Sequence, residues 1–133
     1  MTKAVPDGIT LDALSGPWRI HQRKRGHRWS IDDLLTAHVA VTELPGARTH
    51  LDLGCGIGSV LMLCAYKLPY TRHVGIEAQE ESAGLCRQSL AHNALEDRVE
   101  LRTHDFRAPE AFRESEFFDL ITCLLYTSPS PRD

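Results

Sequence analysis

The sequence predicts an α/β fold built on a parallel β-sheet, and two observations support this prediction. Short apolar segments that end in an acidic residue alternate with segments of roughly 10–15 residues that have helical apolar spacing. After the first of these strands, three glycines occupy alternate positions in the segment His50-Leu51-Asp52-Leu53-Gly54-Cys55-Gly56-Ile57-Gly58. Strands and helices that alternate in this way form right-handed βαβ units, whose strands lie parallel in one sheet.

Length and composition are those of one soluble domain. The chain has 133 residues, of which 42% are hydrophobic and 25% charged, and its net charge is −3. It contains no apolar run of about 18 residues that would predict a membrane span, and its first ten residues lack the apolar core of a secretory signal. The four cysteines form no C-x-x-C pair, so we expect reduced thiols, a cytoplasmic location and no membrane partner.

Residues 1–29 form a basic N-terminal arm. They carry six Lys or Arg residues against two acids, whereas the remaining residues are net acidic. Five of these basic residues fall within ten positions: Arg19, Arg23, Lys24, Arg25 and Arg28. Two tryptophans and two histidines are interleaved with them. A basic arm on an acidic body favours a polyanionic partner such as nucleic acid, and the alternative is a solvated turn between two strands.

Turn signals predict the local structure of this arm. Gly16-Pro17 predicts a turn, and Trp18–Gln22 has the pattern of a short strand. Gly26 is expected in the turn that leads back to a second extended segment, His27–Trp29.

A first helix is expected to start at Ser30 and to end before Pro45-Gly46. Asp33, three residues after Ser30, completes a variant capping box. Apolar residues at helical spacing predict the buried face of this helix, and they are Ile31, Leu34, Leu35 and Val39.

The remaining pattern alternates strands and helices. The predicted strands are Thr49–Leu53, His73–Glu77, Val99–Asp105 and Phe117–Thr122, and the predicted helices are Ser59–Leu68 and Glu80–Leu95, with Leu85, Leu90 and Leu95 turned inward. The histidines at positions 38, 50, 73, 92 and 104 have no metal-ligand spacing. We therefore expect them to be surface or capping residues, and we expect no metal site.

The segment Cys123–Asp133 departs from this pattern. Pro129 and Pro131 exclude a strand or helix over its last six residues. Its eleven residues resemble one translated frame of a transposase-type sequencing adapter. We therefore expect 123–133 to be a non-native tail on a fragment of a longer protein, and a natural disordered tail is the alternative.

The glycine segment predicts a ligand site. Its pattern is D-x-G-x-G-x-G and not the dinucleotide fingerprint G-x-G-x-x-G, whose third glycine would fall on Ser59. An acid in such a loop disfavours a pyrophosphate and suits a cationic or hydroxyl-bearing ligand. Asp52, Glu77 and Asp105 each end a predicted strand, and parallel sheets bind ligands at the carboxyl ends of their strands.

This motif resembles the first motif of class I S-adenosylmethionine-dependent methyltransferases, which implies a Rossmann-like fold with S-adenosylmethionine as cofactor. Glu77, 19 residues after Gly58, matches the acid that binds the ribose hydroxyls, and Asp105 matches the acid that binds the adenine amine. The resemblance also places Ala78 and Phe106 beside the adenine ring. The residues that match the first motif are Asp52, Gly54, Gly56 and Gly58.

Three further segments are similar to bacterial tRNA adenine methyltransferases, which modify the exocyclic amine of the adenine beside the anticodon of a valine tRNA. They are W-S-I-D-D-L-L-T-A, G-I-E-A-Q and R-Q-S-L-A-H-N-A-L-E-D-R-V-E, and the likeness runs from about residue 11 to residue 122. Ser30 and Asp32 match a Ser/Gly-x-Asp step that flanks the donor in this family. The resemblance implies a tRNA partner for the basic arm and an incomplete donor-binding domain over residues 30–122.

One departure from the family concerns catalysis. The family continues its fourth strand into an Asn-Pro-Pro-Tyr type motif that holds the target amine and stacks on the flipped base, but Thr122 is followed here by Cys123-Leu124-Leu125-Tyr126. We therefore expect no catalytic residue in this chain and methyl transfer only in a longer parent protein. The alternatives are a small-molecule or protein-glutamine methyltransferase on the same fold and a non-catalytic RNA-binding module. A nicotinamide-dependent oxidoreductase is disfavoured by Ser59.

Overall fold

The computed structural model describes residues 5–125, so most of the predicted tail lies outside the described residues. Secondary structure within this range is mixed α/β. The elements are β1 (Ile9–Ser15), β2 (Trp18–Arg23), α1 (Ile31–Glu43), β3 (Thr49–Leu53), α2 (Ser59–Lys67), β4 (Arg72–Ile76), α3 (Glu80–His92), β5 (Val99–Arg102), the 3-10 turn η1 (Pro109–Ala111) and β6 (Leu120–Thr122).

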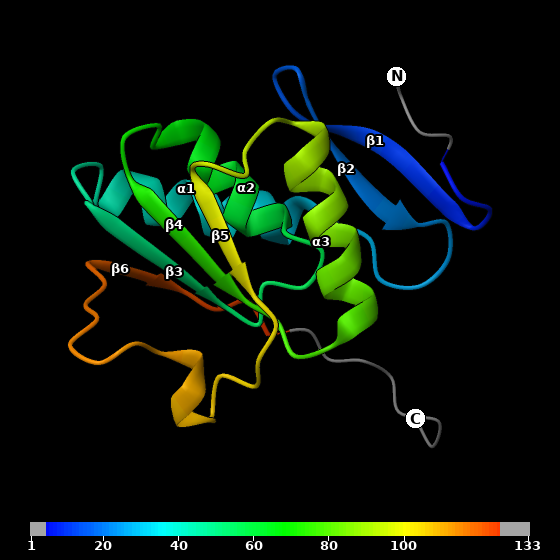
Figure 1. Ribbon diagram of the computed structural model, residues 1–133. Coiled ribbons are helices and arrows are strands. Elements are labelled where there is room, and N and C mark those ends of the chain that lie inside the picture. The colour runs from blue at the N-terminus through cyan, green and yellow to red at the C-terminus, as the bar shows by residue number, and fades with distance from the viewer. Residues whose placement is uncertain (1–4, 126–133) are drawn as a thin grey trace.

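Four strands form a parallel sheet in the order β5-β4-β3-β6 (Figure 1). The first strand after the basic arm, β3, lies inside the sheet, with β4 on one side and β6 on the other. This order needs a crossover between β5 and β6, because these strands are consecutive in the sequence but lie at opposite edges. The arrangement confirms the predicted α/β fold with a parallel sheet.

The two faces of the sheet are covered differently. The helices lie on one side of the sheet, and the segment that contains η1 lies on the other (Figure 1). The larger core cluster is formed mainly by the buried apolar residues of helix α2 together with buried residues of α1, α3 and the hairpin. A smaller cluster on the opposite face joins Leu51, Val74 and Ile76 to Ala111 and the partly buried Phe118.

The strands β1 and β2 form an antiparallel hairpin that packs beside α3 (Figure 1). Side chains of α3 and of its C-cap residue bind the free edge of β2. The Asn93 side chain accepts a hydrogen bond from the Arg19 backbone N–H (2.9 Å) and donates one to the Arg19 carbonyl (2.7 Å). Ser89 Oγ accepts a third from the His21 N–H (2.8 Å). Polar helix residues thus satisfy a strand edge that would otherwise expose unpaired backbone groups.

Several predicted boundaries are corrected. Residues 27–29 form no strand, because Trp18–Arg23 pairs with the preceding segment Ile9–Ser15 across the Gly16-Pro17 turn. The fourth strand of the parallel sheet covers only Leu120–Thr122. The expected strand residue Asp119 instead accepts a hydrogen bond from the Arg48 N–H at 2.7 Å, which fixes the chain before β6 begins.

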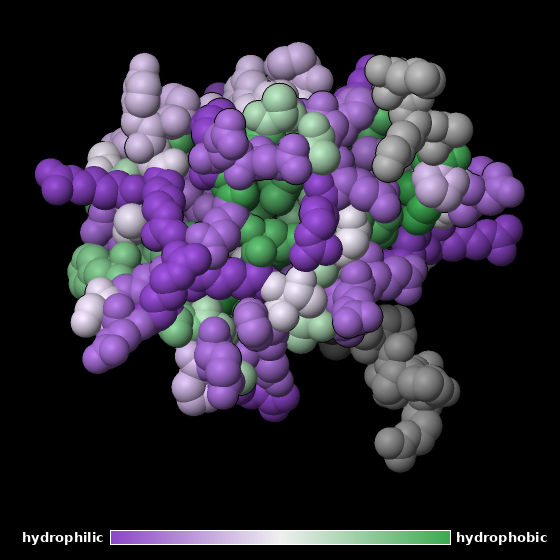
Figure 2. Space-filling model, in the orientation of Figure 1, coloured by the Kyte–Doolittle hydropathy of each residue, from purple (hydrophilic) through white to green (hydrophobic). Residues whose placement is uncertain are grey.

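The predicted inward face of α1 is wrong. Its four apolar residues are 43–61% exposed, whereas the residues that α1 buries are Asp33, Ala37 and Ala40. Helix α1 packs against α2, and small residues at this interface let the two helices approach closely. Within residues 5–125 the apolar stripe stays exposed. On the face of the molecule drawn in Figure 2, hydrophobic side chains gather in the middle and hydrophilic ones lie around them.

Two histidines are also placed differently from the expectation. His50 on β3 and His73 on β4 are fully buried, where surface or capping positions were expected. The physical reason is that they lie side by side in the pairing of two interior strands. Among the helices of the described residues, none has the length and apolar character to cross a membrane.

Candidate functional site

The glycine segment forms a tight turn between β3 and α2. Gly54, Gly56 and Gly58 have φ angles of +65°, +58° and +93°, a region that favours glycine. At Gly58 a side chain is also excluded by space, since a Cβ atom there would lie 2.6 Å from Cys86 Sγ of α3. The Cys55 N–H donates to the carbonyl of Ile76 (3.0 Å), which ties the turn to the end of β4.

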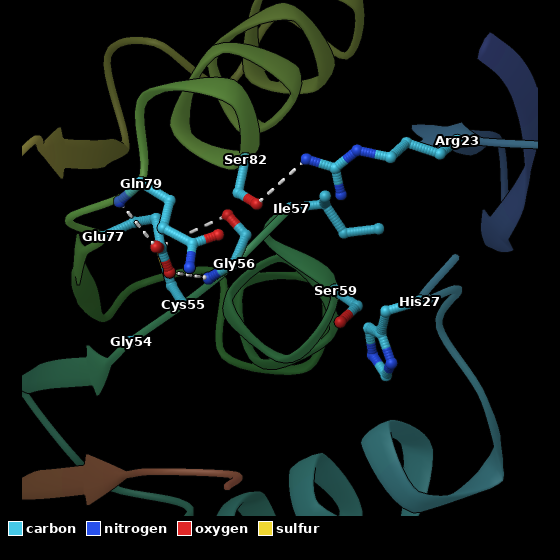
Figure 3. Close-up of a pocket in the computed structure, with 10 residues that line it drawn as sticks. All are labelled: Arg23, His27, Gly54, Cys55, Gly56, Ile57, Ser59, Glu77, Gln79 and Ser82. Carbon is cyan, nitrogen blue, oxygen red and sulfur yellow. Dashed lines mark hydrogen bonds between the residues drawn. The ribbon is translucent and has the colours of Figure 1, made fainter. Parts of the chain in front are cut away.

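A cavity of about 400 Å³ opens at this turn (Figure 3). Its walls come from the glycine turn, the end of β4, the start of α3 and the basic arm. The lining residues are Arg23, His27, Gly54, Cys55, Gly56, Ile57, Ser59, Glu77, Gln79 and Ser82. The volume is within the range of small-molecule sites, and the carboxyl ends of parallel strands are where such sites are expected.

Glu77 is directed at the glycine turn (Figure 3). Its Oε1 accepts a hydrogen bond from the Gly56 N–H (2.7 Å), and its Oε2 accepts one from the Gln79 N–H (2.9 Å). A carboxylate accepts about four hydrogen bonds, so both oxygens keep capacity for a ligand. The structure therefore brings the predicted Glu77 together with Gly54 and Gly56 in one cavity.

Asp52 lies beneath the turn and is only 2% exposed. Burial raises the pKa of its carboxyl to about 7, a hydrogen bond with Thr122 acts in the opposite direction, and the charges of Asp33 and Glu77 raise it further. The Thr122 hydroxyl oxygen is 2.8 Å from Asp52 Oδ1. An acid that titrates near neutral pH below a ligand cavity is a candidate functional group.

Asp33 is a site residue that the sequence reasoning assigned to a helix cap. Ser30 is the N-cap of α1 but makes no side-chain cap bond. The buried Asp33 carboxylate instead accepts a hydrogen bond from the hydroxyl of Ser59, which lines the cavity. Its other oxygen, Oδ1, is buried with no hydrogen-bond partner within residues 5–125. The sequence signal that could have identified Asp33 is its position next to the predicted site residue Asp32. Only the packing of α1 on α2 shows which of these two acids points inward.

The end of β5 is arranged differently. Asp105 does not line the cavity, and its carboxylate instead accepts hydrogen bonds from Arg107, including one from Nη2 at 2.6 Å. These hydrogen bonds hold the pKa of Asp105 at about 2. The ring of Phe106 reaches the turn, since its Cε2 would lie 3.9 Å from a Cβ atom on Gly54. Ala78 is exposed beside Glu77 and is not part of the cavity wall.

The flanking residues Ser30 and Asp32 are exposed at the start of α1 and do not line the cavity either. Asp33 turns inward at the next position. The expected contact of Ser30 and Asp32 with a cofactor therefore stays a prediction.

The basic arm reaches the cavity through Arg23 and His27. Arg23 Nε forms an ion pair with Glu81 of α3 at 2.6 Å, and its Nη2 lies 3.5 Å from Ser82 Oγ (Figure 3). Arg28 pairs with Asp12 of β1 at 3.0 Å. Three other basic residues of the arm, Arg19, Lys24 and Arg25, are exposed.

Thiol chemistry is disfavoured at the site. The Cys55 thiol interacts with Cys86, and this interaction together with burial raises its pKa well above the ordinary value. Burial and the Asp52 charge raise the pKa of Cys64 to about 12. Such thiols stay protonated and unreactive at neutral pH. In the described part of the chain no group of His, Cys, Asp and Glu residues could hold a metal ion.

Comparisons with known proteins agree with this geometry. A profile of the family described as methyltransferase domain matches residues 51–132, a range that begins in β3 and contains every cavity-lining residue except Arg23 and His27. A tRNA1(Val) (adenine(37)-N6)-methyltransferase of Bacteroides thetaiotaomicron is 32% identical over 93 residues. That match covers 63% of this chain but 39% of the relative, so the chain spans well under half of the relative's length.

Solved structures show the same fold. A 16S rRNA methyltransferase of T. thermophilus, RsmC, solved with AdoMet and guanosine, matches 95% of this chain and 35% of its own with a TM-score of 0.69 at 20% identity. CalS10, an amino pentose methyltransferase of Micromonospora echinaspora solved with bound SAM, matches 76% of this chain and 38% of its own, with a TM-score of 0.55 at 30% identity.

The matched range 51–132 contains the glycine turn and Glu77, and the solved structures share the fold of the chain. The predicted class I fold and its S-adenosylmethionine cofactor are confirmed at the level of the family. The chain belongs to the methyltransferase domain family.

Proposed function

We propose that this chain is the donor-binding part of an enzyme that methylates the exocyclic amine of an adenine in tRNA. The observation that carries the proposal is the placement of the basic arm. Arg23 and His27 line the cavity that contains Glu77 and the glycine turn, and the exposed Lys24 and Arg25 follow Arg23 directly. An RNA backbone held by these cations would bring a base to the donor. The Bacteroides relative, a tRNA methyltransferase, supports this substrate.

The cavity fits S-adenosylmethionine in its size and in the hydrogen-bonding groups around it. Glu77 would accept hydrogen bonds from the ribose hydroxyls, since both its oxygens keep acceptor capacity. The positive-φ glycines leave the backbone open to the methionine part. The buried and unpartnered Asp33 Oδ1, next to Ser59 in the wall, suits a ligand that brings N–H donors. When bound, the cofactor supplies an electrophilic methyl group on a sulfonium.

The residues of this chain would bind and orient the donor, and the holding of the target amine is assigned to residues after β6. An exocyclic amine is a weak nucleophile because its lone pair is conjugated with the ring, so catalysis depends on positioning. The predicted catalytic motif belongs after Thr122, where residues 123–125 form neither helix nor strand. We therefore propose that methyl transfer requires a protein in which β6 continues into an amine-holding loop.

Binding and turnover experiments test the two parts separately. Calorimetry should show that the 133-residue chain binds S-adenosylmethionine. A protein continued beyond Thr122 with its natural sequence should methylate tRNA transcripts, whereas the 133-residue chain should not. Donor binding without tRNA methylation by the continued protein would overturn the substrate proposal, and turnover by the 133-residue chain would overturn the assignment of catalysis to later residues.

The likeness to an amino pentose methyltransferase, at 30% identity, favours a second candidate, a small-molecule methyltransferase. The two candidates differ in their use of the arm. A small substrate needs only the cavity, whereas tRNA binding by Lys24 and Arg25 releases counterions and weakens steeply with salt. Absence of salt-dependent tRNA binding would favour the small-molecule methyltransferase over both the tRNA methyltransferase and a non-catalytic RNA-binding module.

A further inference from the structure

A buried chain of polar side chains runs beneath α2 from the carbonyl of Leu68 to Asp52. His73 Nε2 lies 3.0 Å from the Leu68 oxygen, and His73 Nδ1 lies 2.9 Å from His50 Nδ1. His50 Nε2 is 2.8 Å from Thr122 Oγ1, which in turn is 2.8 Å from Asp52 Oδ1. The four side chains are at most 5% exposed. The donor site is thus linked by hydrogen-bond distances to the opposite end of the sheet.

Strand pairing places these side chains on one face. His50 pairs with His73 across β3 and β4, and Asp52 pairs with Thr122 across β3 and β6. His50 and Asp52 are two residues apart on one strand, so their side chains point to the same side. That side is the one covered by α2, because a Cβ atom on Gly75, two residues after His73, would meet Leu61 of α2. The alignment is therefore fixed by the sheet.

The carbonyl of Leu68 fixes the direction of the hydrogen bonds, because it only accepts. His73 must therefore carry its proton on Nε2 and, when neutral, accept at Nδ1 from His50 Nδ1–H. His50 Nε2 is then an acceptor for the Thr122 hydroxyl. The single hydroxyl proton of Thr122 is used in this bond, so the contact with Asp52 Oδ1 requires that Asp52 supplies the proton.

The opposite direction of the hydrogen bonds is unfavourable at the Leu68 end of this series of side chains. If Asp52 is ionised and accepts from Thr122, then neutral His50 must donate from Nε2 and accept at Nδ1 from His73. His73 would then present an unprotonated Nε2 to the Leu68 carbonyl, and two acceptors would face each other at 3.0 Å. The only escape is a buried imidazolium, which burial disfavours: it lowers the pKa of His50 to about 3 and also lowers that of His73.

We propose that His73, His50 and Thr122 are positioning residues that hold a proton on Asp52 in the donor-free protein, and that binding of the cationic donor releases this proton to solvent. The second half rests on the proposed function. In the empty site, the proton removes a negative charge from Asp52 that would otherwise lie near Asp33 and Glu77. When the donor is bound, its ammonium compensates the charge of ionised Asp52 instead.

Among residues 5–125, the other titratable groups that interact with Asp52 supply no compensating cation. Those that interact with it electrostatically come from α1, the end of β4, the glycine turn, α2 and the residue after β6, and they are Asp33, Glu77, Cys55, Cys64 and Cys123. All are acids or thiols, which disfavour ionisation of Asp52. Because the donor binds the ionised form, its affinity should rise with pH up to the pKa of Asp52 in the free protein, by at most about tenfold per pH unit.

Nuclear magnetic resonance on the donor-free 133-residue chain tests the first half directly. Nitrogen-15 spectra should show His73 protonated on Nε2 and His50 protonated on Nδ1, and the carbon-13 signal of the Asp52 carboxyl should titrate in the neutral range. A His50 protonated on Nε2, or an Asp52 that titrates with an ordinary acidic midpoint, would overturn the proposal. This measurement needs neither a variant nor donor binding.

Two substitutions of similar volume should move the Asp52 midpoint differently. In His50→Leu the Thr122 proton has no imidazole acceptor and is free to stabilise ionised Asp52, so the midpoint should fall by about one pH unit or more. In Thr122→Val both protonation states of Asp52 lose this hydrogen-bond partner, while burial and the neighbouring acids still favour the protonated form, so the midpoint should not fall. A purely structural role predicts no such contrast, and a fall in both variants or in neither would contradict the proposal.

Calorimetry with S-adenosylmethionine in two buffers of different ionisation enthalpy tests the second half. Wild-type protein should release a fraction of a proton on binding near pH 7, and His50→Leu should release almost none there. Equal release from both proteins would contradict the donor-linked step. A complete lack of donor binding would instead refute the proposed function, while the tautomer and midpoint measurements would still decide the role of the histidines.

Discussion

The ends of the interior strands and the end of β5 carry the same kind of side chain but use it differently. Glu77 follows β4 and accepts backbone hydrogen bonds from the glycine turn and from Gln79 inside the cavity. Asp105 follows the edge strand β5, is 42% exposed at its side chain and pairs with Arg107. Strand β4 has a neighbouring strand on both sides, whereas β5 has one on a single side. The position of a strand in the sheet thus determines whether the acid at its end is enclosed.

The segment after β5 is held by side-chain ion pairs, and removing one of them should have one of the two largest effects on stability. Arg102 Nη1 and Nη2 lie 2.7 and 2.6 Å from the two oxygens of Glu116, and both side chains are below 10% exposed. Glu116→Gln leaves the buried Arg102 with one acidic partner, Glu100, within residues 5–125, so we expect a loss of about 3 kcal/mol in the free energy of unfolding. Urea denaturation measures it, and Glu114→Gln, an exposed site in the same segment, should cost little.

The same pair predicts an acid dependence. Hydrogen bonds from Arg102 lower the pKa of Glu116 to about 2. Because the folded-state pKa lies below the unfolded value of 4.5, its stabilisation is present above about pH 4.5 and is lost as the pH falls toward 2. Urea midpoints between pH 5 and 3 should decline more steeply for the wild type than for Glu116→Gln. Parallel curves would show that Glu116 is not the source of the acid dependence.

The glycine turn is held by its backbone, so its sensitivity should depend on space. Gly58→Ala combines a positive φ with a Cβ atom 2.6 Å from Cys86 Sγ, and we expect a loss of about 3 kcal/mol in stability. Gly56→Ala has a positive φ but no atom within 4 Å of the added Cβ, so only about 1–2 kcal/mol should be lost. Equal denaturation midpoints for the two variants would show that crowding by α3 is unimportant.

Donor binding should separate the two acids directly. Glu77→Ala removes a charge-assisted contact in the cavity, and the affinity for S-adenosylmethionine should fall by about 1.5–3 kcal/mol in calorimetry. Asp105→Ala removes an exposed carboxylate that is already paired with Arg107, so we expect a change of about threefold or less. A loss as large as that of Glu77→Ala would show that Asp105 leaves Arg107 and binds the donor, as its sequence match predicts.

The smallest expected effect concerns the arm. Replacing the exposed Lys24 and Arg25 by alanine should reduce the slope of log affinity against log salt for tRNA by about 1.5–2, with unchanged donor affinity. Arg23 is left intact because it pairs with Glu81. Arg48→Ala, at an exposed position directly before β3, is the control. An unchanged slope in the double variant would assign Lys24 and Arg25 to a solvated turn.

The sequence by itself determined the order of strands and helices after residue 30, the glycine turn and the family. These features depend on local signals: apolar runs, helical spacing, and glycines where φ is positive. The bounds of β3 are as predicted, and Leu85, Leu90 and Leu95 are buried as expected. Asp52 and Glu77 were predicted as site residues because each lies at the end of a strand, and the ends of neighbouring parallel strands lie together.

Tertiary structure alone decided which face of each element is buried. Helix α1 turns Asp33 inward and its apolar stripe outward because its small residues pack on α2. His50 and His73 have no local signal of burial, since their contact joins residues 23 positions apart. Burial then shifts the pKa of His50 and of Asp52 in opposite directions, because the charged form of each is the one that loses hydration.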